Sequence, residues 1–211
     1  MRSQVLFVIS SYIAHAVSMS LTPTKGSWLV QQLPPGKGSF LLFQWQNAAQ
    51  TARANGFSPA SEAVGEGAFR MKALSDALPQ VVAQSKILAM CDQGNLSFDK
   101  LQEPHASIAE RLSKTKMIAA LSAGSGSAVA FVSEWDDHVS IDKCVVNPSY
   151  MGLSADAEAH LLRHVATEAL EAGKTDVRLA GMFQVDGDEF YERCGFYPTG
   201  EEEGAYQYKA E

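Results

Sequence analysis

Two histidines at helical spacing are the first residues whose types could do chemistry. His160 and His164 are four positions apart, so on a helix both imidazoles face one side, as in the helix that binds zinc in many metalloproteases. Leu161 stands where such a protease has its catalytic glutamate, and no third ligand is obvious. We interpret the pair as a solvated helix face and keep a metal hydrolase as the alternative enzyme class.

A glycine-rich stretch, Gly124-Ser125-Gly126-Ser127, has the small residues of a phosphate-binding loop. It lacks the Gly-Lys-Ser/Thr ending that supplies a positive charge to the phosphates. It also joins two runs of β-forming residues. We therefore predict a hairpin turn here.

The composition is that of an ordinary soluble globular protein and excludes several classes. The chain has 211 residues, 46% of them hydrophobic, and a net charge of −7. No run approaches the roughly 18 apolar residues of a membrane span, and the acidic balance argues against a nucleic-acid partner. Cys91, Cys144 and Cys194 are too few for a fully paired disulfide set and lack metal-ligand spacing, so we expect free thiols and no metal.

The charges divide the chain into two parts. All 24 acidic residues lie at or after Glu62. Before it, a basic start, an apolar run and Ala14-His15-Ala16 fit a secretory signal, and residues 19–61 resemble an organelle transit peptide. We expect residues 1–66 to be a targeting leader or a poorly ordered extension. A signal followed by a transit-like stretch predicts plastid localisation, with the cytoplasm or the secretory pathway as alternatives and no membrane contact after leader removal.

A different interpretation of the leader stays open. Residues 40–45 are more apolar than most transit peptides, and an alanine-rich run follows to Ala54. These residues could form a helix that packs on the main domain.

Residues 67–211 have the size of one domain and alternate between strand-like and helix-like patterns. The predicted order is β-α-α-β-β-β-α-β-α-β, an α/β fold with a mixed sheet. The predicted strands are 69–74, 117–123, 128–134, 139–146, 177–180 and a last extended run ending near 206–208. The predicted helices begin at Ser75 and near Pro104 and continue with 157–172, ended by Gly173, and 188–193. The apolar face of the first helix comprises Leu78, Val81, Val82, Ser85 and Leu88; Glu158 is placed on the polar side of the third.

Three stretches then indicate a family. They are residues 69–79, Val146-Asn147-Pro148-Ser149-Tyr150-Met151-Gly152 after the fourth predicted strand, and Phe190-Tyr191-Glu192-Arg193-Cys194-Gly195-Phe196 near the end. Together they resemble the GCN5-related N-acetyltransferase (GNAT) family over most of residues 67–211. The resemblance implies a GNAT-like mixed sheet flanked by helices and acetyl-CoA as co-substrate.

The resemblance also implies where acetyl-CoA binds. Its pantetheine arm would lie between the fourth and fifth strands, against backbone groups around Cys144 and Val146. Its pyrophosphate would lie against backbone N–H groups at the start of the next helix. That loop departs from the family pattern, because a cationic or amide residue and two small residues are replaced by Met151, Ser154 and Asp156. We expect weakened CoA binding by a site comprising Met151, Gly152, Leu153, Ser154, Ala155, Asp156 and, in place of a family asparagine, Gln184.

Three catalytic candidates follow from the same resemblance. Tyr191 is at the position of the general acid, and Glu134 or Asp142, with His138 between them, would be the base. The acidic charge of the domain favours a cationic acceptor, either a small amine or an amine of a protein. The expected function is acetyl-CoA-dependent N-acetyl transfer to an amine. The alternative is a catalytically degenerate GNAT-fold binding protein; the oligomeric state stays open.

Overall fold

The computed structural model describes residues 28–55, 66–97, 106–122, 125–147, 151–180, 188–200 and 205–209. The strands are β1 (Leu29–Leu33), β2 (Thr115–Ser122), β3 (Ser125–Glu134), β4 (His138–Val146), β5 (Asp176–Leu179), β6 (Phe196–Pro198) and β7 (Tyr206–Tyr208). The helices are α2 (Pro35–Ala54), α4 (Glu66–Asp92), α5 (Ala106–Lys114), α6 (Met151–Glu171) and α7 (Asp188–Arg193). None of these helices has both the length and the apolar character needed to cross a membrane.

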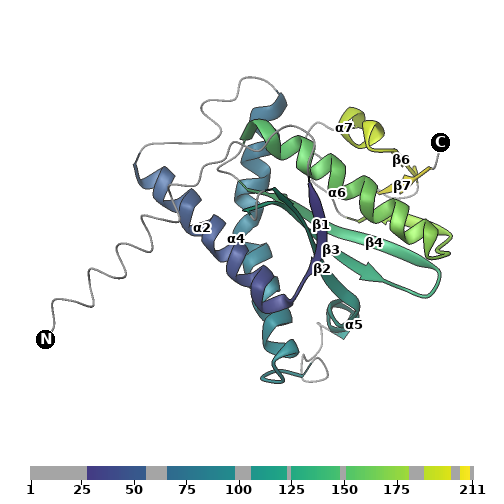
Figure 1. The fold of residues 1–211 in the computed structure, drawn as a ribbon, viewed down its shortest axis with the longest axis horizontal. Coiled ribbons are helices and arrows are strands. Elements are labelled where there is room, and N and C mark those ends of the chain that lie inside the picture. The colour runs from purple at the N-terminus through teal and green to yellow at the C-terminus, as the bar shows by residue number, and fades with distance from the viewer. Residues whose placement is uncertain are drawn as a thin grey trace, which may run out of the picture.

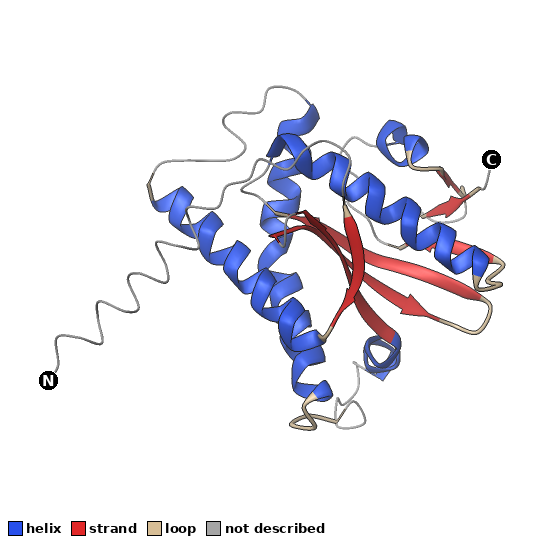
Figure 2. Cartoon of the chain, in the orientation of Figure 1, coloured by secondary structure: helices blue, strands red, loops and turns tan. Residues whose placement is uncertain are grey.

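The described strands form one mixed sheet in the order β1-β2-β3-β4-β5-β7-β6. Strands β4 and β5 are parallel, whereas the other neighbours are antiparallel. Helices lie on both sides of the sheet (Figure 2). The predicted fold class, an α/β fold with a mixed sheet flanked by helices, is confirmed.

The first strand is not where the sequence predicted it. Residues 69–74, predicted as a strand, lie inside helix α4. Their alternating pattern also contains Arg70, Met71, Lys72, Ala73 and Leu74, which are all strong helix formers. The first strand is instead Leu29–Leu33, which pairs antiparallel with β2 from Leu29↔Leu121 to Leu33↔Met117.

Residues 29–54 belong to the folded unit. Helix α2 packs against α4 (Figure 1), and its Leu42 and Trp45 side chains are 0% and 4% exposed. The predicted boundary at residue 66 is therefore wrong for this stretch, because its apolar side chains supply part of the core. The alternative, a helix packed on the domain, is observed. Residues 1–27 lie outside the described residues, so targeting by that segment stays a prediction.

Two hydrophobic cores lie on opposite faces of the sheet, because side chains alternate along each strand. Helix α6 covers one face, where Leu161 and Leu162 pack on residues such as Ile141. Helices α2 and α4 cover the other face, where Leu42 and Val81 contact the cluster around Phe131. The predicted apolar face of α4 is confirmed by the burial of Leu78, Val81, Val82, Ser85 and Leu88.

Helix α6 differs from the prediction at two positions. It begins at Met151 rather than near residue 157. Glu158, predicted on the polar side, is 1% exposed, because it lies one turn before the buried Leu162 and shares its face. The predicted end is confirmed: Gly173 has φ +85°, and the amide of Lys174 donates to the Ala169 carbonyl, as in a left-handed helix cap.

Candidate functional site

Strands β4 and β5 stay paired over only the first part of β4. Their parallel register runs from His138↔Asp176 to Ile141↔Leu179. The amide of Ala180 then donates to the carbonyl of Ile141 over 3.1 Å. Strand β5 ends at Leu179, but β4 continues to Val146. We call this parting of the two strands, at Ile141 and Leu179, the β4–β5 fork.

A β-bulge lies at the fork. On β3, Phe131 pairs with Lys143 and the next residue, Val132, pairs with Ile141, which leaves Asp142 as the extra residue. A bulge bends its strand and changes the direction of a side chain. The bulge therefore places a carboxylate where β4 and β5 part.

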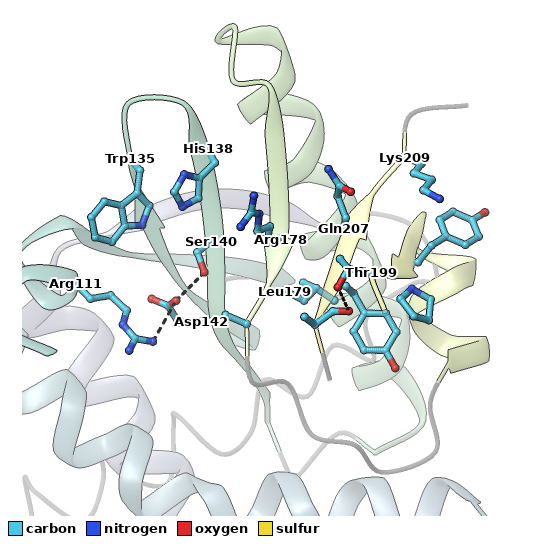
Figure 3. A pocket seen from close by; sticks show the side chains of 15 residues that line it. Arg111, Trp135, His138, Ser140, Asp142, Arg178, Leu179, Thr199, Gln207 and Lys209 are labelled. Atoms are coloured by element: carbon cyan, nitrogen blue, oxygen red, sulfur yellow. Dashed lines mark hydrogen bonds and ion pairs between the residues drawn. The ribbon is translucent and has the colours of Figure 1, made fainter. Parts of the chain in front are cut away.

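The Asp142 carboxylate is buried and held by three neighbours. It accepts hydrogen bonds from the hydroxyls of Ser133 and of Ser140, the second 2.9 Å long. The Nη1 atom of Arg111 on α5 lies 3.8 Å from its Oδ1 (Figure 3). These contacts fix the position of the carboxylate.

Asp142 faces a cavity of about 760 Å³ that is bounded by β4, β5, β7 and α5. Ser140, Arg178 and Gln207 form a cross-strand row along it, since Arg178 pairs with both of the others. Val177 and Leu179 face the core beneath α6, so the intervening Arg178 projects from the opposite face of the sheet. The lining also includes Trp135, His138, Tyr206 and Lys209.

Glu134, the other predicted base, lies outside this cavity. It is at the end of β3 and forms ion pairs with Lys116 and, over 3.8 Å, with Lys174. The hydrogen bond from Lys116 lowers the pKa of Glu134, in part against the effect of burial. Of the two predicted bases, the structure brings only Asp142 to the cavity.

Tyr191, the predicted acid, lies behind the cavity lining. Its side chain on α7 is 2% exposed. Its ring centroid is 5.0 Å from that of Tyr206, which lines the cavity, and 5.4 Å from that of Phe190. The tyrosine is therefore one aromatic ring away from the cavity, and its catalytic role stays a prediction.

The predicted CoA-binding residues lie along and beyond the far part of β4. Cys144 and Val146 are on β4 after the fork, with side chains buried in the core beneath α6. Met151, Gly152, Leu153, Ser154 and Ala155 form the first turns of α6, where a loop was expected. The replacement of loop glycines favours helix here. Asp156 is exposed in the second turn, and Gln184 lies outside the described residues.

The histidine pair on α6 does not form a metal centre in the part of the chain that the structure describes, where no three His, Cys, Asp or Glu residues gather as ligands. The two rings stack with centroids 6.4 Å apart. His164 Nε2 lies 3.3 Å from a carboxylate oxygen of Glu168. Burial, then the neighbouring His164 and Arg163, lowers the pKa of His160.

The sequence did not indicate several residues of the cavity, namely Arg111, Arg178, Tyr206, Gln207 and Lys209. Each is a common residue on a short strand, a helix or a chain end. The strand order β4-β5-β7 and the packing of α5 against β3 bring them together. A charged residue between two buried ones, as in Val177-Arg178-Leu179, was the one available signal.

No protein-family model and no curated protein sequence matches the chain. The solved structures that are similar to it include two acetyltransferases. The PaiA N-acetyltransferase from Thermoplasma acidophilum, in complex with coenzyme A, is 12% identical; the match covers 88% of this chain and 100% of that one, with a TM-score of 0.47. A GNAT family acetyltransferase from Brucella melitensis, in complex with acetyl-CoA, is 15% identical and covers 59% of this chain and 79% of that one, with a TM-score of 0.36.

Both are acetyltransferases. The Brucella protein is a member of the family that the three motifs of this chain resemble.

Proposed function

We propose that the chain is a GNAT-type acetyltransferase that transfers the acetyl group of acetyl-CoA to an amine. The observation that carries the proposal is the β4–β5 fork. The fork has a bulged carboxylate, Asp142, at its vertex and the cavity on one side. Helix α6 begins at Met151, shortly after β4 ends at Val146. An extended pantetheine arm between the strands would take the place of a strand, and the reacting thioester would face the cavity.

The residues present fit acetyl-CoA as a substrate. Backbone groups of β4 after the fork, around Cys144 and Val146, would bind the pantetheine arm. The first four N–H groups of an α-helix have no partner within the helix, and the dipole favours an anion there. In α6 these groups belong to the turn that begins at Met151. They would bind the pyrophosphate, with Gln184 as a further predicted contact.

The reaction would use two side chains of the chain and its backbone. The amine nitrogen attacks the thioester carbonyl carbon, and Asp142 accepts the proton that the nitrogen loses. Backbone N–H groups near Val146 would stabilise the developing oxyanion. As the new C–N bond forms, the C–S bond breaks and the leaving thiolate takes up a proton. Tyr191, which lies behind the cavity residue Tyr206, is the predicted donor of this proton.

Binding and turnover test the proposal separately. Acetyl-CoA at a hundredfold excess over its Kd should stabilise the fold by about 2.7 kcal/mol, visible as a rise in melting temperature. Tyr191→Phe, which keeps the buried ring, should lower turnover and leave this shift unchanged. Absence of any shift at millimolar acetyl-CoA would refute the proposal, and an unchanged rate in Tyr191→Phe would remove Tyr191 from the mechanism.

A second candidate is a catalytically degenerate GNAT-fold protein that binds a partner or a metabolite. It is favoured by the changes at Met151, Ser154 and Asp156, which remove a cationic or amide side chain and glycine residues and add an exposed carboxylate. An acetyl-CoA-dependent thermal shift without release of free thiol, over a broad panel of amines, would support this candidate against the enzyme.

A further inference from the structure

We propose that the acceptor is a small amine that also carries a carboxylate, and that Arg178 binds this carboxylate. The inference rests on the proposed acetyltransferase function and adds the class of acceptor. The overall negative charge predicts a cationic acceptor instead. We infer a different class of acceptor because the charged side chains that line the cavity are mainly basic.

The charges that face the cavity are mainly positive, although the chain as a whole carries −7. Arg111, Arg178 and Lys209 line it, and His138 adds an imidazole. Asp142 supplies one carboxylate, which Arg111 already faces at 3.8 Å. Since the potential inside a cleft depends on its own walls, this lining attracts anions more than cations.

Arg178 has the geometry of a carboxylate-binding residue. Its Nε donates to Oδ2 of Asp176, and the other oxygen of that carboxylate accepts a 3.0 Å hydrogen bond from Gln207 Nε2. These contacts hold the guanidinium on the cavity wall between Ser140 and Gln207 (Figure 3). The side chain is 58% exposed, and its two Nη groups have no partner among the described residues.

A guanidinium group that is held at Nε still presents N–H donors from both Nη groups. These donors match the spacing of carboxylate oxygens, an arrangement that an ammonium group cannot reproduce. Asp176 offsets part of the charge of Arg178, and Lys209, whose ammonium lies 5.3 Å from the centroid of the Tyr197 ring, restores positive charge at the rim.

The positions of Arg178 and Asp142 suggest the length of the acceptor. Arg178 pairs with Ser140, and Asp142 is two residues further along β4. One strand spacing and two residues along a strand separate the two backbone positions by about 8 Å. An acceptor whose amine lies near Asp142 can therefore reach Arg178 with its carboxylate across a short carbon chain.

The test uses three amines with the same four-carbon chain, namely 4-aminobutyrate, butylamine and 1,4-diaminobutane, together with ω-amino acids of two to six carbons. Acetyl transfer is followed as release of free thiol from acetyl-CoA. We expect kcat/KM for the best amino acid to exceed that for butylamine by about 10- to 100-fold, as for one hydrogen-bonded charge pair. The diamine should be a poorer acceptor than butylamine.

Variants assign the effect to Arg178. Arg178→Gln should raise KM for the amino acid by about 10- to 100-fold, which removes the advantage of the amino acid over butylamine in kcat/KM. The thermal shift with acetyl-CoA should stay unchanged. Arg178→Lys should restore only part of the affinity. Arg163→Gln, which removes an exposed arginine from α6 on the other side of the sheet, is the matched control and should behave as the wild type.

The outcomes separate the two proposals. Preference for the diamine or butylamine over every amino acid, or an unchanged KM in Arg178→Gln, overturns the inference and leaves the acetyltransferase standing. Failure of acetyl-CoA to bind overturns the proposed function, and this inference with it.

Binding can also be followed without turnover, because Trp135 lines the cavity. Quenching of tryptophan fluorescence by 4-aminobutyrate in the wild type, lost in Arg178→Gln, would support the inference.

Discussion

The hydroxyl of Ser140 donates a 2.9 Å hydrogen bond to Oδ1 of Asp142, two residues along the same strand. The bond spans the bulge of β4, and Ser133 on β3 donates to the other carboxylate oxygen. Asp142 is thereby fixed at the fork and cannot turn into the solvent. A general base must be held within reach of the proton that it accepts, and this arrangement meets that requirement.

Asp142→Asn is expected to lower kcat by about 10²- to 10⁴-fold, because it removes the proton acceptor and keeps the size of the side chain. Acetyl-CoA binding, followed by thermal shift, should stay near that of the wild type. Glu134→Gln provides the comparison, since Glu134 lies outside the cavity and is paired with two lysines. Its kcat should equal the wild-type value; the opposite pattern would assign the base to Glu134.

Leu42→Ala should destabilise the fold by about 2–5 kcal/mol, the usual cost of truncating a fully buried leucine. Urea denaturation of the full chain measures the loss. Leu29→Ala is the matched control, because this leucine on β1 is mostly exposed, and it should change stability by about 0.5 kcal/mol or less. Equal stability of Leu42→Ala and the wild type would show that α2 is not part of the cooperative core.

Gly195→Ala tests a close approach within the Phe190–Phe196 motif. Gly195 has φ +89°, and a Cβ atom there would lie 2.6 Å from Cε2 of Tyr208. We expect the strain of a left-handed residue, about 1–2 kcal/mol, and an additional loss from displacement of the tyrosine ring.

Gly200→Ala separates the two contributions to that loss. Gly200 has φ +75°, but no described atom lies within 4 Å of its would-be Cβ, so only the backbone strain applies. Thermal denaturation should rank Gly195→Ala clearly below Gly200→Ala. Equal melting temperatures would contradict the close contact.

His160 should make the fold less stable in mild acid. Burial lowers its pKa in the folded chain, whereas an unfolded histidine titrates near 6.5. As the pH falls through about 6.5, the unfolded chain takes up this proton before the folded chain does, and stability decreases. Urea midpoints at neutral pH and about pH 5.5 should differ less in His160→Gln than in the wild type. Equal differences would contradict this role of His160.

The central strands and the short helix α7 could be predicted from the sequence. The runs 117–123, 128–134 and 139–146 correspond closely to β2, β3 and β4, and 188–193 coincides with α7. These segments have strong local patterns. The strand predicted at 69–74 failed because six alternating residues also suit a helix, and the apolar stretch that supplies β1 and α2 was interpreted as a leader because it carries no acid.

The candidate site was predictable only in part. Asp142 and Tyr191 were predicted from the family resemblance. The structure places Asp142 in the lining of the cavity and Tyr191 behind the lining residue Tyr206. The cationic lining could not be foreseen. Arg111, Arg178 and Lys209 are far apart in the sequence. The pairing of β4 with β5 and of β5 with β7 brings Arg178 and Lys209 to the cavity, and helix α5, which contacts β3, brings Arg111. Non-local pairing of this kind leaves no periodic signal in the chain.

The pairing of β1 also limits how a precursor of this protein could mature. A peptidase that cut near residue 61 would remove both the strand that covers the edge of β2 and the helix that contributes Leu42 to the core. Loss of the buried Leu42 and Trp45 side chains would open the core on that face of the sheet. If the first residues are a targeting peptide that is cleaved in an organelle, we therefore expect cleavage before Leu29. The mature protein would then retain β1 and α2, which make up most of the acid-free segment.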